Sequence, residues 1–196
     1  VVLRWAVAAA AVVLVVGGVL VHRAGRYQRI GEMAEVVGQP QVRQRGAARA
    51  SAAREREAVC NGAELVTAPA EKLAVRFADG SRLVLSEGTK ATLSGEGYFG
   101  DCGHYLPHVC LHHGEVLCEL KSLRHFRGVG TPLGTAIVEG TVFRMKYVRG
   151  DHVLLEVLEG AVQFSCPEGE VRAEAGTTWV VDAGKQKPRR VSGPPE

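Results

Sequence analysis

A chain of 196 residues has room for one domain with its own core and a short appendage. Its charge is uneven: residues 1–58 carry nine Arg and four Glu, a net of +5, and residues 59–196 carry fifteen Lys plus Arg and seventeen Asp plus Glu, a net of −2. The positive charge lies at one end, where the anionic headgroups of a membrane attract it. This pattern is not a nucleic-acid footprint, and we expect no nucleic-acid partner.

The first element is an apolar run over residues 5–21, which contains no charged residue and follows a flank of four residues, 1–4. Its length is at the short end of what spans a hydrocarbon core, so we expect an uncleaved transmembrane helix. A cleaved signal peptide is an alternative, but its apolar region is usually shorter, and the residues after this run form a poor cleavage site. A buried core helix is the third alternative. The chain begins with Val1 rather than Met, which is consistent with a fragment or with the use of an alternative start codon.

Residues 22–35 form an expected juxtamembrane segment, with a weakly helical pattern over 27–36. Residues 36–42 predict a first strand, with Pro40 suited to a sheet edge. Residues 45–57 are rich in Ala and Arg and have no apolar face, which predicts a loop or one helical turn. Short alternating runs then continue to about residue 182, so we expect a β domain over 36–184 and a disordered tail over 185–196.

The stretch 130–164 has the clearest pattern, because apolar and polar residues alternate in short runs that glycines interrupt. Gly140 and Gly160 each precede a short strand, where a backbone turn or bulge suits glycine. Strand-opening glycines also occur at Gly62 and Gly114, but the spacings of 52, 26 and 20 residues are too irregular for a repeat protein. The sequence predicts an all-β fold, either a two-sheet sandwich or a β-solenoid-like stack of short strands.

The apolar phase of these strands predicts the core. The expected core residues are Leu73, Val75, Phe77, Leu83, Leu85, Val142, Phe143, Leu155, Val157, Val162, Phe164 and Trp179.

Several short motifs occur in an order that resembles the FecR domain. They are Asp-Gly-Ser at 79–81, Gly-Glu-Val at 114–116, Gly-Thr-x-Phe at 140–143, Glu-Gly-x-Val at 159–162 and Ala-Gly at 175–176. The resemblance covers about residues 36–184. It implies a single-pass inner-membrane protein whose β domain lies in the periplasm, takes a signal from an envelope protein partner and regulates a sigma factor. Only four residues precede the apolar run, so the sequence given contains no cytoplasmic sigma-binding domain.

The charges next to the apolar run disagree with that orientation. Arg4 precedes the run, and Arg23, Arg26 and Arg29 follow it. By the positive-inside rule the C-terminal side would be cytoplasmic, whereas the resemblance places it outside. We expect the outside placement.

One cluster could carry chemistry: residues 102–118 contain three of the five cysteines and four of the seven histidines. If residues 108–112 form a strand, His108, Cys110 and His112 share a face, and His104 can approach from the preceding segment. The sequence favours a structural role, either a disulfide such as Cys102–Cys110 or cysteines that pack as small hydrophobic residues. The alternative is a Zn²⁺ or Cu site, with these four residues as its ligands. The FecR resemblance supplies no metal site, and we expect no other cofactor.

Catalysis has little support in the sequence. Asp79, Ser81 and His152 have no spacing that indicates a triad, and the chain has no Gly-x-Ser-x-Gly, phosphate loop or dinucleotide fingerprint. We expect no enzyme, no catalytic residues and no small-molecule substrate. Two other functions stay open: a metal- or redox-responsive binding protein that uses the 102–118 cluster, and an envelope scaffold module.

Overall fold

The computed structural model describes residues 29–94, 109–121, 127–138 and 140–191, and all regular secondary structure within them is β. The predicted all-β class is confirmed. The strands are β1 (Arg29–Val37), β2 (Gln41–Arg43), β3 (Ser51–Ala52), β4 (Ala58–Cys60), β5 (Glu64–Val66), β6 (Lys72–Phe77), β7 (Arg82–Leu85), β8 (Lys90–Leu93), β9 (Val109–Glu119), β10 (Gly128–Thr131), β11 (Gly134–Val138), β12 (Val142–Val148), β13 (His152–Glu159), β14 (Ala161–Cys166), β15 (Gly169–Glu174), β16 (Thr177–Asp182) and β17 (Arg189–Val191).

The predicted flank 1–4 and transmembrane helix 5–21 lie outside the described residues. Among the residues that are described, no helix is long and apolar enough to span a membrane.

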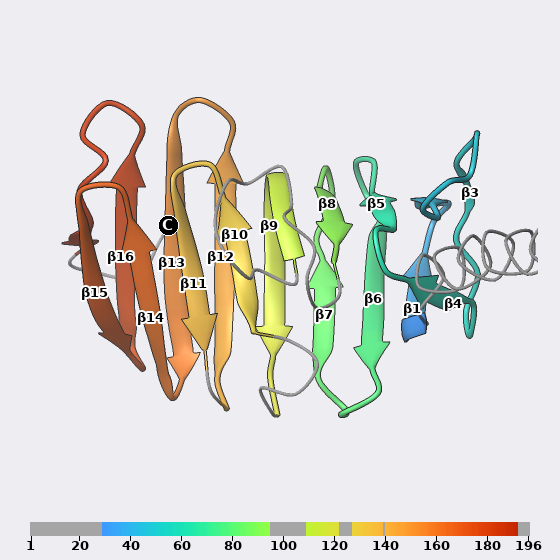
Figure 1. Cartoon of the computed structure of the whole chain (residues 1–196), viewed down its shortest axis with the longest axis horizontal. Helices are drawn as coiled ribbons and strands as arrows, with labels where there is room; N and C mark the ends of the chain where they lie inside the picture. The colour runs from blue at the N-terminus through green and yellow to red at the C-terminus, as the bar shows by residue number, and fades with distance from the viewer. Residues whose placement is uncertain (1–28, 95–108, 122–126, 139, 192–196) are drawn as a thin grey trace, which may run out of the picture.

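The strands pair in two sheets that share β9 and so form one mixed sheet (Figure 1). The first sheet has the order β4-β1-β6-β7-β9-β12-β13-β16-β17. The second has the order β3-β2-β5-β8-β9-β10-β11-β14-β15. Of the ladders between described strands, only β9–β10 is parallel. In Figure 1 the strands stand side by side along the long axis, from β3 and β4 at one end to β15 at the other.

One hydrophobic core combines side chains from both sheets. Leu73 and Phe143 come from the first sheet, and Leu65 and Phe164 from the second. Most of the predicted core residues are buried. Two differ: Val142 is half-buried, and Trp179 is half-buried against the edge of the core. Since neighbouring residues on a strand face opposite sides, the inward position of Phe143 turns Val142 outward.

At several corners where the chain passes between the two sheets, the turn carries a glycine with positive φ. Gly38, Gly62, Gly88, Gly114 and Gly140 occupy such corners, at intervals of 24, 26, 26 and 26 residues. The sequence analysis omitted Gly38 and Gly88, which explains its interval of 52 residues, whereas the interval of 20 from Gly140 to Gly160 remains shorter.

The β structure extends beyond both predicted boundaries. Within the described residues it runs from Arg29, before the predicted start at residue 36, to Val191, after the predicted end at residue 184. The weakly helical pattern over 27–36 is overridden, because β1 pairs with β4 and β6 and buries Met33. The predicted strand over 36–42 is wrong: a corner at Gly38 separates β1 from β2.

Candidate functional site

The predicted Cys/His cluster lies on β9, the strand that belongs to both sheets. Before Gly114 this strand pairs with β8 and β10, and after Gly114 it pairs with β7 and β12. Gly114 has a φ of +94°, and a Cβ there would lie 2.5 Å from the Cα atom of Thr89. Only glycine fits this corner, so the residues on its two sides belong to different sheets.

Cys110 and His112 share a face of β9, as predicted. Val109 and Leu111 face the core, and the two alternating residues face away from it. The Nε2 atom of His112 lies 2.8 Å from the Oγ1 atom of Thr92.

Cys110 takes part in a disulfide bond, while Cys60, Cys118 and Cys166 are free thiols. The proposed partner Cys102 lies outside the described residues. A sulfur in a disulfide is no thiolate ligand, so a metal site that includes Cys110 requires the reduced protein.

The predicted zinc ligands His104 and His108 also lie outside the described residues. Within the described ranges, no group of three or more His, Cys, Asp or Glu side chains could hold a metal ion. The four-ligand zinc site therefore stays a prediction.

Cys118 lies apart from Cys110 and His112, because it follows the corner at Gly114 and so belongs to the first sheet. It is fully buried in the core, where burial raises the pKa of its thiol well above the ordinary value and the charge of Glu119 raises it further. Cys118 therefore packs as a small neutral side chain. His113 also has a structural role, since its Nδ1 atom donates a hydrogen bond of 3.0 Å to the carbonyl oxygen of Gly88.

The hairpin predicted at 79–81 is present between β6 and β7. The Oδ1 atom of Asp79 accepts a hydrogen bond of 2.9 Å from the backbone N–H of Ser81. The hydroxyl oxygen of Ser81 in turn accepts one of 3.1 Å from the backbone N–H of Lys121. His152 pairs with Val148, beside the Gly114 corner, whereas Ser81 precedes Arg82, which pairs with Glu119 at the other end of the strands. Ser81 and His152 therefore do not meet.

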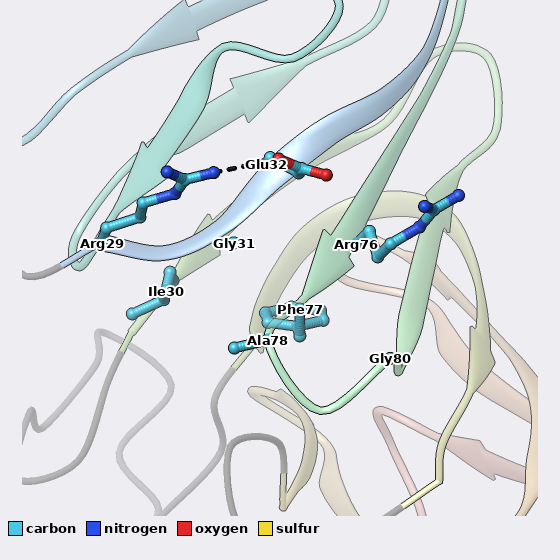
Figure 2. A pocket seen from close by; sticks show the side chains of 8 residues that line it. All are labelled: Arg29, Ile30, Gly31, Glu32, Arg76, Phe77, Ala78 and Gly80. Atoms are coloured by element: carbon cyan, nitrogen blue, oxygen red, sulfur yellow. Dashed lines mark hydrogen bonds and ion pairs between the residues drawn. The ribbon is translucent and has the colours of Figure 1, made fainter.

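The same hairpin forms one wall of a pocket of about 390 Å³ (Figure 2). Its other wall is the start of β1. The lining residues are Arg29, Ile30, Gly31, Glu32, Arg76, Phe77, Ala78 and Gly80.

The pocket exists because β1 extends past β6. Pairing between them ends at Gly31 and Phe77, and the chain then turns away through Ala78 and Gly80, which add little bulk. Gly31 itself has no room for a side chain, because a Cβ would lie 2.6 Å from the carbonyl oxygen of Arg76.

The rim of the pocket is charged. Arg29 and Glu32 form an ion pair of 2.9 Å, and Arg76 extends from β6 on the other side (Figure 2). Within the described part of the chain, Arg76 forms no side-chain hydrogen bond or ion pair. Sequence reasoning missed this pocket, because it assigned the residues of β1 to a juxtamembrane segment. The run Arg76-Phe77-Ala78 before the Asp-Gly turn was the only local signal.

Fold and motifs together define an all-β module of a known family. The FecR protein family model matches residues 63–163, and the chain belongs to this family.

Among solved structures, the chain resembles two crystal structures of a candidate anti-sigma factor from Parabacteroides distasonis ATCC 8503. Both have a TM-score of 0.53, at 20% and 19% sequence identity, and each comparison covers 65% of this chain. The chain spans only 58% of the length of those proteins, so the likeness concerns the fold. No curated protein matches the chain.

Proposed function

We propose that this chain is a membrane-anchored regulatory module that acts by binding a protein partner and influences the activity of a sigma factor. It carries out no catalysis. The observation that carries the proposal is the FecR family match over residues 63–163, which lies on a fold similar to that of a candidate anti-sigma factor.

In this proposal residues 5–21 anchor the protein in the inner membrane and the β domain lies in the periplasm. The disulfide at Cys110 supports that side, because disulfides persist in oxidising compartments. The arginine count around the apolar run favours the opposite side.

The regulatory role is tested by deleting the gene in the bacterium that encodes it and measuring all transcripts. We expect a small set of promoters that share one sigma-factor recognition sequence to change by several-fold, and the full chain supplied in trans to restore them. Unchanged promoters in the deletion strain would contradict the proposal.

A further inference from the structure

The pocket between β1 and the 79–81 hairpin carries a cation, Arg76, that forms no ion pair among the described residues. The carboxylates beside it are already engaged: Glu32 pairs with Arg29 at 2.9 Å, and Glu35 pairs with Arg82 at 2.6 Å. Arg76 lies opposite Glu32 in the strand register but forms no ion pair among the described residues.

The neighbourhood of Arg76 increases the positive charge. Arg82 lies directly opposite Arg76 on β7, but its charge is compensated by Glu35 at 2.6 Å and Glu119 at 3.7 Å. Lys121 approaches the same hairpin, since its Cδ atom lies 3.6 Å from the position of a Cβ on Gly80. Lys121 also forms no ion pair in the described ranges. An anion supplied from outside could pair with Arg76 and Lys121.

The floor of the pocket is apolar and small. Ile30, Phe77 and Ala78 supply apolar surface, and Gly31 and Gly80 leave space above it. A volume of about 390 Å³ accommodates a few side chains. The complementary group therefore combines a carboxylate with an adjacent apolar side chain.

We propose that this pocket binds an extended segment of the protein partner in which Asp or Glu is followed by an apolar residue. The carboxylate pairs with Arg76, and the apolar side chain lies against Ile30 and Ala78. This assignment rests on the proposed function, because it takes the partner to be a protein. A protein segment suits the site because the pocket offers a charged and an apolar contact together, and arginine is enriched at protein interfaces.

The test uses the full chain in detergent and immobilised decapeptides with a Ser/Gly background that differ at two central positions: Glu-Leu, Gln-Leu, Glu-Ser and Lys-Leu. The variants are Arg76→Glu, which reverses the charge, and Ala78→Trp, which fills the pocket. Matched controls are Arg172→Glu on β15, an exposed arginine that forms no ion pair in the described part, and Ala175→Trp at another exposed turn.

We expect the wild-type chain and both controls to retain the Glu-Leu peptide at least about fivefold better than the Gln-Leu or Glu-Ser peptide, as a charge-assisted contact at an open site allows. Arg76→Glu should lose this preference and favour the Lys-Leu peptide instead. Ala78→Trp should lose binding of all four peptides.

Equal binding of the Glu-Leu and Gln-Leu peptides, or an unchanged preference in Arg76→Glu, would overturn the proposal. Binding that glycerol 1-phosphate abolishes while the peptides show no preference would assign the pocket to a lipid headgroup and also overturn it. The peptide measurement tests binding at the pocket only, so a negative result does not contradict the proposed regulatory role. A chain that binds the peptide while its deletion changes no promoter would overturn the regulatory role and keep the pocket.

Discussion

At the scale of single residues, the direction of each side chain relative to the two sheets decides its contribution. Phe143 and Val142 are neighbours on β12, yet Phe143 is fully buried and Val142 lies on the outer face. Glu64 on β5 lies on the outer face of the second sheet, where it pairs with Arg43 at 3.0 Å and Lys90 at 3.1 Å.

Phe143→Ala should lower the free energy of unfolding by about 3–5 kcal/mol, because it removes a packed aromatic ring from the core. Val142→Ala is the matched control and should cost about 1 kcal/mol or less, since that side chain is only partly removed from water. Urea unfolding of both variants measures the difference. Equal costs would show that the phase of β12 is misassigned.

Glu64→Gln should make stability less dependent on acid pH. Burial by itself raises the pKa of the Glu64 carboxyl, but the hydrogen bonds and charges of Lys90 and Arg43 outweigh it and hold the pKa below its ordinary value. The stabilisation is therefore present above the unfolded value of about 4.3 and is lost as pH falls through the lower folded pKa.

Urea unfolding between pH 3 and 7 measures this effect. The wild type should exceed Glu64→Gln by up to about 1 kcal/mol at pH 7, as for partly exposed ion pairs, and the two should converge in acid. The control is Glu170→Gln on β15, at a residue without an ion pair in the described part. A gap that widens in acid would contradict the linkage.

At the scale of elements, β9 holds the fold together because it is the strand common to both sheets. Its corner at Gly114 packs directly against Thr89, whose hydroxyl donates a hydrogen bond of 3.1 Å to the carbonyl oxygen of Glu115 and accepts one of 3.0 Å from its backbone N–H. Neighbouring corners are thus bonded to one another, and a distortion at Gly114 affects both sheets.

Gly114→Ala should destabilise the protein by about 2–5 kcal/mol, from the positive φ together with the clash against Thr89. Gly150→Ala is the control: its φ is +76°, and a Cβ there meets nothing within 4 Å. It should cost only about 1–2 kcal/mol. Thermal unfolding of the two variants separates the cost of the clash with Thr89 from the cost of backbone strain. Equal losses of stability in the two variants would exclude the clash.

Reduction of the disulfide at Cys110 should lower the free energy of unfolding by about 2–4 kcal/mol. Cys60→Ser, which removes a free thiol, should retain the wild-type response to reduction. Zn²⁺ added to the oxidised protein should leave the melting temperature unchanged.

In the reduced protein, the zinc site predicted at His104, His108, Cys110 and His112 would raise the melting temperature with Zn²⁺, and less so as pH falls through about 6.5. A reduced protein that does not respond to Zn²⁺ would exclude that site.

At the scale of the whole molecule, the described part of the two sheets ends in β3 and β4 on one side and in β15 and β17 on the other, and no further described strand pairs with these edges. Such edges invite pairing with other chains. Here β3 and β17 are only two and three residues long, and the longer β15 carries Glu170, Arg172 and Glu174. Short and charged edge strands oppose uncontrolled association through the sheet edges.

The proposed membrane anchor makes a prediction for the whole protein. It should stay in the membrane fraction in high salt and carbonate, because the apolar run 5–21 holds it without help from the arginines. The β domain should be cleaved by protease added to spheroplasts. Release of a soluble species beginning near Ala24 would indicate a cleaved signal, and protection from protease would place the domain in the cytoplasm.

The sequence by itself determined the all-β class, the hairpin at 79–81 and the inward phase of strands such as β6, β7 and β13. These features depend on alternation and turn chemistry within about ten residues. Only the tertiary structure decided that residues 29–37 form a strand, because its partners β4 and β6 are distant in sequence.

The corner at Gly114 likewise separates Cys118 from Cys110 although the two cysteines share one strand. The pocket with Arg76 arises where β1 extends past β6. Sheet membership and strand overhang depend on which distant strands pair, and no local pattern encodes that choice.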